Sequence, residues 1–174
     1  SDLPNIFHYW SNKYLLPKLQ TIDKSVNNNI DFYIYYIKQI SVKKEIKICS
    51  FGSGNCNIEI EIAEKLLKDN INNFKISCVD INEYMLQRGK EECKRLNLIT
   101  HFEFVKSDIK SWNSDIKYDI FLAEAALHHF VDLEILFDKI YEKLNIDGYF
   151  LINDTIGRNG HQRWPEVELF INMI

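Results

Sequence analysis

From Ile46 onward, short apolar runs alternate with longer amphipathic stretches, and this rhythm constrains the fold more than any other feature of the sequence. Short runs rich in β-branched and aromatic residues are typical of strands, whereas apolar residues three or four positions apart are typical of helices. Strands that alternate with helices build βαβ units around a mostly parallel sheet. The sequence therefore predicts a doubly wound α/β domain. Its five strands are expected at residues 46–51, 75–79, 101–105, 118–123 and 149–153.

Helices are expected between these strands. The segment that begins at Asn57 is ambiguous, because Ile58, Ile60 and Ile62 alternate as they would in a strand. Leu66 continues the apolar pattern at helical spacing, which favours a helix. Two further helices are expected at residues 84–96, after an Asn82 cap, and at residues 133–144.

Aromatic residues at helical spacing precede the sheet, between Ile6 and Leu15 and again between Phe32 and Ile40. We expect them to form an amino-terminal helical cap or lid at residues 1–44, followed by an α/β core at residues 45–174. A chain of 174 residues is long enough for one domain of this kind and too short for two ordinary ones.

Composition excludes several function classes. The net charge of −4 and the pI near 5.7 argue against broad, sequence-independent binding of nucleic acid. No apolar run approaches the roughly 20 residues that span a bilayer, and the amino end lacks a secretory pattern, so a cytoplasmic protein without membrane attachment is expected. None of the four cysteines forms a C-x-x-C pair; we expect reduced core thiols rather than a disulfide or zinc ligands, and no metal site.

A glycine turn follows the first predicted strand, in the run Phe51, Gly52, Ser53 and Gly54. Glycine allows a left-handed backbone and a close approach of another group, and open α/β sheets place ligands at this end of their strands. A simple tight turn is the alternative interpretation. Asp80 ends the neighbouring strand, where its carboxylate can accept hydrogen bonds from both ribose hydroxyls of an adenosine; a helix-capping acid is the alternative.

A third strand end carries another acid. Asp108 is suited to hold an adenine amino group beside Ile109, which would pack on the ring, although a plain turn aspartate is the alternative. A dinucleotide site is disfavoured, because the third glycine of G-x-G-x-x-G would fall at Asn57.

Taken in order, the segments 48–56, 78–82, 107–109, 118–129 and 145–153 resemble the motifs of class I S-adenosylmethionine-dependent methyltransferases. The resemblance implies S-adenosylmethionine as cofactor and S-adenosylhomocysteine as product. It places the glycine turn on the methionine part, Asp80 on the ribose, Asp108 with Ile109 on adenine, and Glu124 and Ala125 beside the methionine and the methyl group. The implied cofactor-binding residues are Phe51, Gly52, Ser53, Gly54, Asp80, Ile81, Met85, Asp108, Ile109, Glu124 and Ala125. Two positions depart from the pattern: Ser50 replaces a common acid, and Cys56 replaces a small glycine.

Candidate catalytic residues follow the fourth and fifth strands. His128 and His129 could remove a proton from an acceptor, although adjacent histidines also serve loop structure. After the fifth strand, residues 157–166 read Gly-Arg-Asn-Gly-His-Gln-Arg-Trp-Pro-Glu and resemble a stretch found in a subgroup of bacterial methyltransferases. Within it, His161 and Arg163 are candidates to face the acceptor.

The resulting hypothesis is a methyltransferase that acts on a small-molecule or peptide acceptor. A cofactor-binding but inactive regulatory domain is the first alternative, and an NAD-dependent oxidoreductase is a more distant one. Because class I methyltransferases usually have two strands beyond the fifth, we expect a further chain segment or a homodimer to complete the sheet edge.

Overall fold

The computed structural model describes residues 5–40, 45–154 and 169. Its strands are β1 (Ile46–Phe51), β2 (Phe74–Asp80), β3 (Phe102–Lys106), β4 (Tyr118–Glu124) and β5 (Leu144–Asn153). They form one sheet in the order β3-β2-β1-β4-β5, and every neighbouring pair is parallel. The predicted doubly wound α/β fold is therefore confirmed. Because the chain runs outward from β1 to β3 and then returns beside β1, the strand order reverses between β1 and β4, where such sheets bind their ligands.

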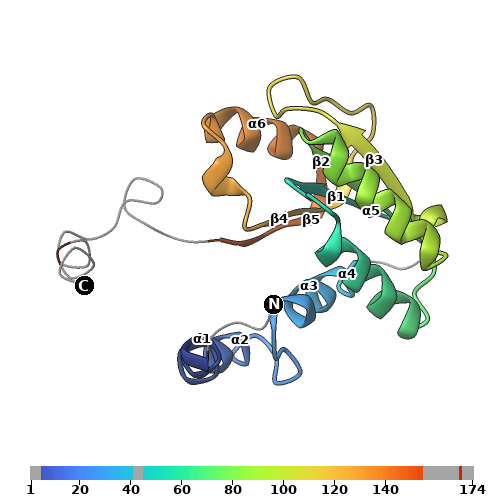
Figure 1. The fold of residues 1–174 in the computed structure, drawn as a ribbon. Coiled ribbons are helices and arrows are strands. Elements are labelled where there is room, and N and C mark those ends of the chain that lie inside the picture. Colours follow the sequence, from blue (N-terminus) through green and yellow to red (C-terminus); the bar gives the residue numbers. More distant parts are fainter. Residues whose placement is uncertain (1–4, 41–44, 155–168, 170–174) are drawn as a thin grey trace.

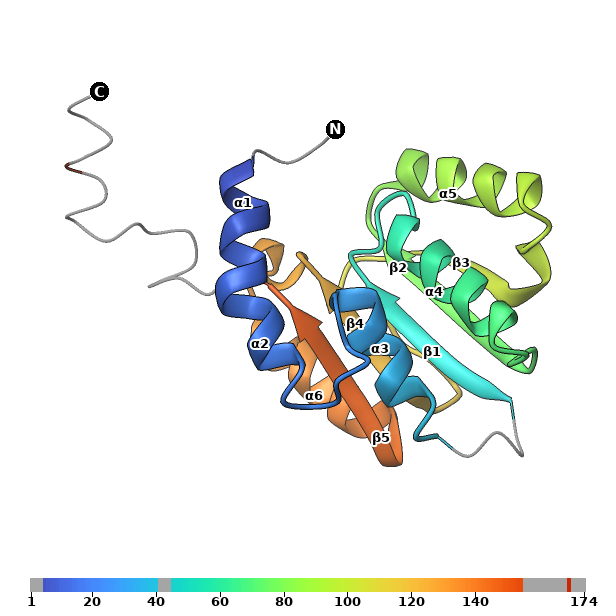
Figure 2. The same ribbon diagram turned by 90° about the horizontal axis from the view of Figure 1, so that it is seen from below.

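Helices cover both faces of the sheet. In Figures 1 and 2, α3 (Asn29–Ile37), α4 (Asn57–Lys68) and α5 (Glu83–Arg95) lie on one face, and α6 (Leu133–Lys143) lies on the other. The predicted helix at α4 is confirmed, and the predicted cap of α5 is present, since the Asn82 side chain accepts hydrogen bonds from the backbone N–H groups of Tyr84 and Met85. The short elements are α1 (Asn5–Trp10), the π-helical η1 (Ser11–Leu15), α2 (Leu16–Leu19) and the 3₁₀ turns η2 (Ile99–His101) and η3 (Leu127–His129).

Strand alternation divides the core between the two faces. Ile48 of β1 and Leu122 of β4 pack with α3 and α4, whereas Phe51 and Phe121 belong to a second cluster with Leu136 of α6. Even-numbered residues of β1, and those of β4 from Ile120 onward, therefore face α3 and α4. Ser50 and Glu124 follow this phase, so two polar groups point toward the same helices.

All four cysteines are buried, as predicted for core thiols. Among residues 5–40 and 45–154, no helix combines the length and the apolarity needed to cross a membrane.

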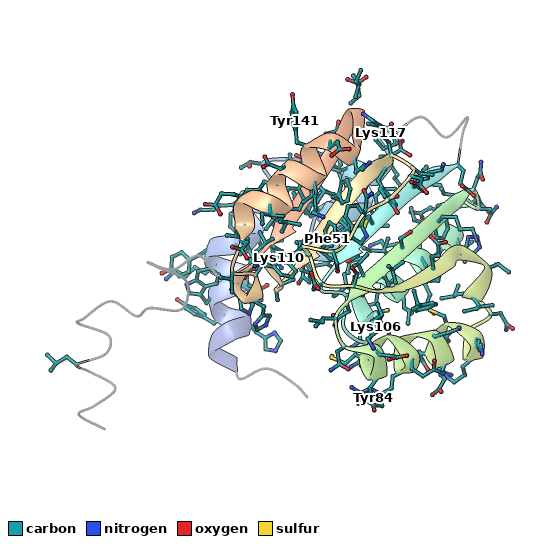
Figure 3. All side chains as sticks on the ribbon, turned by 90° about the horizontal axis from the view of Figure 1, so that it is seen from above. Phe51, Tyr84, Lys106, Lys110, Lys117 and Tyr141 are labelled. Atoms are coloured by element: carbon teal, nitrogen blue, oxygen red, sulfur yellow. The ribbon has the colours of Figure 1, made fainter. Side chains whose placement is uncertain are left out.

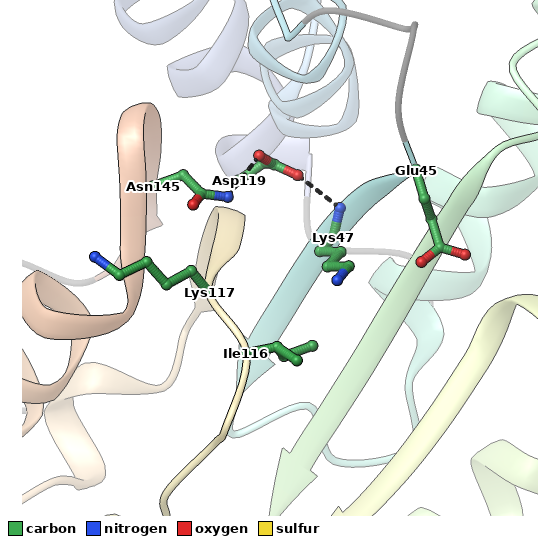
Figure 4. A pocket seen from close by; sticks show the side chains of 6 residues that line it. All are labelled: Glu45, Lys47, Ile116, Lys117, Asp119 and Asn145. Atoms are coloured by element: carbon green, nitrogen blue, oxygen red, sulfur yellow. Dashed lines mark hydrogen bonds between the residues drawn. The ribbon is translucent and has the colours of Figure 1, made fainter.

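Asp119 connects three strands at the amino ends of the sheet. Its buried carboxylate accepts a hydrogen bond from the backbone N–H of Lys47 at 3.0 Å and another from the Asn145 side chain at 2.9 Å (Figure 4). The pairing of β4 with β5 shifts register beside Asp119, between Tyr118 and Ile120. The side-chain bonds of Asp119 thus join β1 to β5 where the regular ladder is interrupted.

Replacing Asp119 with Ala should lower the free energy of unfolding by about 2–3 kcal/mol, because partly buried donors on β1 and β5 lose their acceptor. Urea denaturation measures this change. Asp138→Ala, at an exposed position of α6, is the matched control and should change stability by less than about 0.5 kcal/mol. Equal stability of the two variants would contradict a structural role for Asp119.

Candidate functional site

A cavity of about 700 Å³ lies at the carboxyl ends of β1, β2, β3 and β4, a size suited to a small-molecule ligand. In Figure 3, Phe51 lies near the middle of the molecule with Lys110 close by, and both line this cavity. The remaining lining residues are Gly52, Gly54, Val79, Asp80, Ile81, Met85, Ser107, Asp108, Ile109, Ala125, Ala126, His129, Phe130, Val131 and Asp132. Nine of the eleven predicted cofactor-binding residues therefore line one cavity; Ser53 and Glu124 do not.

The glycine turn forms one wall of the cavity. Gly52 donates a backbone hydrogen bond to the carbonyl of Val79 at 2.8 Å, which ties the turn to the end of β2. The φ angles of Gly52 and Gly54 are +67° and +53°, in the left-handed region that favours glycine. A Cβ atom on Gly52 would lie 2.6 Å from the Cβ of Ala126. The turn and the segment after β4 can approach this closely only because Gly52 has no side chain.

Asp80 holds the turn from the neighbouring strand. Its Oδ2 accepts a hydrogen bond from the backbone N–H of Gly54 at 2.8 Å, and its Oδ1 accepts one from the N–H of Asn82 at 2.7 Å. A carboxylate offers about four acceptor positions, so these two bonds leave capacity for two further donors. The cap of α5 is Asn82 rather than Asp80. Asp80 is thus a turn-bound carboxylate in the cavity wall.

Asp108 makes the contacts of a turn aspartate while it lines the cavity. Its Oδ1 accepts hydrogen bonds from the backbone N–H groups of Lys110 at 2.8 Å and Ser111 at 2.9 Å. The amide and hydroxyl of Ser111, and then Lys110, lower the pKa of the Asp108 carboxyl below its ordinary value. Asp108 is therefore an anion that these bonds orient at the rim.

Glu124 is directed toward α3. The Tyr33 hydroxyl donates to its Oε2, and the side chains of Asn29 and Asn153 donate to its Oε1, each at 3.0 Å. The next residue, Ala125, lines the cavity with a φ of +47°. Glu124 thus anchors α3 to the end of β4, directly before Ala125.

The two adjacent histidines occupy different positions. His129 lines the cavity, and its ring centroid lies 3.9 Å from that of His128. Nδ1 of His128 lies 2.6 Å from Oδ1 of Asp154, whose Oδ2 accepts a hydrogen bond from the backbone N–H of Leu127 at 2.7 Å. Asp154 therefore holds both the 3₁₀ turn at Leu127 and the imidazole ring of His128. The other predicted catalytic residues, His161 and Arg163, and the whole stretch 157–166 lie outside the described residues.

Two residues near the site were missed by the sequence reasoning. Asp154 opens the polar stretch after the fifth strand, but no role of its own was predicted for it. Glu59 is only 2% exposed and accepts a hydrogen bond from the Ser50 hydroxyl. Its neighbours Ile58 and Ile60 are apolar, so the local pattern gave no sign of a buried acid. The one indication of such an acid was Ser50, because a polar side chain inside a buried strand requires a hydrogen-bond partner.

Comparisons with known proteins agree with this arrangement. Residues 42–165 match the family model described as a methyltransferase domain. Two curated relatives are the carboxy-S-adenosyl-L-methionine synthase of Nautilia profundicola, 26% identical over 77% of this chain and 57% of the relative, and the malonyl-[acyl-carrier protein] O-methyltransferase 1 of Ilyobacter polytropus, 24% identical over 73% and 42%. The chain thus spans about half the length of each relative.

A similar solved structure is that of the O-methyltransferase from a trans-AT polyketide synthase of Brevibacillus brevis with S-adenosyl-L-homocysteine. Its TM-score is 0.60 at 20% identity, over 82% of this chain and 45% of that one. This likeness supports the fold. The family match covers well over half of the chain, and the chain therefore belongs to the methyltransferase-domain family.

Proposed function

We propose that this chain binds S-adenosylmethionine in the cavity and transfers the methyl group to a small-molecule or peptide acceptor. The proposal rests on one observation. Asp80 accepts a hydrogen bond from the glycine turn at Gly54, beside the point where the strand order of the sheet reverses. The family match supports methyl transfer, and the relatives' names supply two acceptor or product types, a carboxylated cofactor and an acyl-carrier-bound malonyl group.

The residues present fit this cofactor. The open acceptor positions of Asp80 suit two ribose hydroxyls, and Ile81 and Ile109 offer apolar surface to an adenine ring beside Asp108. The hydroxyl of Ser53 is buried and has no hydrogen-bond partner among the described residues, although it lies within the glycine turn. A polar group of a ligand that seats on the turn would give this hydroxyl a partner.

When bound, S-adenosylmethionine supplies an electrophilic methyl group. The chain's contribution is alignment of the acceptor with that methyl group and removal of a proton where the acceptor carries one. His129 at the cavity wall is our candidate to contact the acceptor. His128 is a candidate positioning residue, because Asp154 orients its ring and favours a proton on Nδ1. His161 and Arg163 remain proposed acceptor contacts.

Binding and single-turnover measurements test the proposal together. S-Adenosylmethionine and S-adenosylhomocysteine should raise the melting temperature, and NAD should not. Methyl-labelled cofactor should then transfer label to an acceptor in fractionated cell extract. Binding without transfer would favour an inactive regulatory domain, and stabilisation by NAD alone would contradict the proposal.

A further inference from the structure

The buried carboxylate of Glu59 belongs to the helix that follows the glycine turn. Glu59 is in the first turn of α4, which starts soon after Gly54. Its hydrogen-bond donor, Ser50, precedes Phe51 in β1, and Phe51 lines the cavity. Ser50 is therefore the neighbour in β1 of a residue that lines the cavity, although its own side chain points to the face that α4 covers.

The groups around Glu59 are acids or neutral donors. The carboxylates of Glu124 on β4 and Asp80 on β2 act on it electrostatically, and Glu59 in turn acts on Tyr33 of α3, Cys78 of β2 and Cys93 of α5. Among the described residues, the hydrogen bonds to Asp80 and Glu124 also come from neutral groups only. Within the described part of the chain, three carboxylates thus gather at the strand ends without a cationic partner.

This environment favours the protonated form of Glu59. Burial is the main cause that raises its pKa, to about 7, and the nearby carboxylates raise it further, while the Ser50 hydrogen bond opposes them. Near neutral pH, a substantial fraction of Glu59 therefore carries a proton.

We propose that the Ser50–Glu59 pair is the counter-ion site for the positively charged methionine end of S-adenosylmethionine, and that binding of the cofactor expels the proton from Glu59. The inference rests on the proposed function. The cofactor carries a sulfonium and an ammonium group against one carboxylate, so it brings net positive charge to the cavity. A nearby positive charge favours the ionised carboxylate, and the displaced proton passes to the buffer. No bond of the cofactor changes in this step.

The affinity for the cofactor should depend on pH. Because binding lowers the pKa of Glu59, the affinity for S-adenosylmethionine should rise with pH up to about 7 and level off above it, when the carboxylate is ionised before binding.

Calorimetric titration of the whole chain with S-adenosylmethionine tests this at pH 6.5, in two buffers whose ionisation enthalpies differ. The wild type should release about 0.5–1 proton per cofactor bound. Glu59→Gln should abolish the release, whereas Glu64→Gln, at an exposed position of the same helix, should preserve it. Ser50→Ala is a second variant that retains the carboxylate; loss of the hydroxyl raises the pKa of Glu59, so the rise in affinity should move to higher pH.

Cofactor binding without proton release, or release that persists in Glu59→Gln, would overturn the inference. Failure of the wild type to bind S-adenosylmethionine would instead overturn the proposed function. Thermal melting at pH 8 checks that Glu59→Gln is folded. At this pH the raised pKa of Glu59 reduces the stability of the wild type, and the substitution removes this buried ionisable group. The variant should therefore melt no lower than the wild type. If Glu59→Gln does not fold, Ser50→Ala decides the question, and an unchanged pH profile in that variant would count against the pair.

Discussion

Replacing Asp80 with Ala is expected to weaken the binding of S-adenosylmethionine by at least about 100-fold, measured by calorimetry. The substitution removes the proposed acceptor for two ribose hydroxyls, and hydrogen bonds to a charged group contribute about 1.5–3 kcal/mol each. It also frees the backbone N–H of Gly54, which Asp80 holds at 2.8 Å. Both losses should act on the bound cofactor, since the carboxylate fixes the turn and is the proposed contact to the ribose.

Two further variants serve as comparisons. Asp80→Asn retains one oxygen acceptor and should bind more tightly than Asp80→Ala, yet more weakly than the wild type. Asp115→Ala, at an exposed position outside the cavity wall, should leave the affinity unchanged. Unchanged affinity in a folded Asp80→Ala protein, as judged by thermal melting, would remove the central residue of the site.

The sequence predicted the strands and the cavity wall well, because both depend on local patterns. Apolar runs mark the strands, and the residues that follow parallel strands must meet at one edge of the sheet. Asp80 and the glycine turn could therefore be placed together before any coordinates were known. The fifth strand was predicted at residues 149–153, whereas β5 begins at Leu144, since the irregular pairing beside Asp119 admits residues that do not alternate.

Contacts between segments far apart in the chain could not be predicted. Glu124 was expected beside the methionine of the cofactor because it follows the fourth strand, yet its donors come from Asn29, Tyr33 and Asn153. No periodicity or spacing encodes such a pairing. Glu59 was missed for a similar reason: its apolar neighbours explain the helix, and the burial of its carboxylate depends on α3 packing over α4.

Loss of the Tyr33 side chain should lower the stability of the fold strongly. This side chain is fully buried in the core that α3 shares with the sheet, so Tyr33→Ala should lower the free energy of unfolding by about 3–5 kcal/mol, measured by urea denaturation. The truncation leaves a cavity and removes one donor from Glu124. Tyr141→Ala is the matched control, because Tyr141 is 88% exposed on α6 and should contribute little.

Tyr33→Phe isolates the contribution of the hydroxyl group. Burial, followed by the neighbouring Glu124 carboxylate, raises the pKa of Tyr33, so the hydroxyl remains a donor across the physiological pH range. Its removal should cost about 1–2 kcal/mol of stability, because Glu124 retains its bonds from Asn29 and Asn153. Since Ala125 lines the cavity directly after Glu124, this folded variant should also bind S-adenosylmethionine more weakly. Equal stability and affinity in Tyr33→Phe and the wild type would show that α3 acts on the site through packing alone.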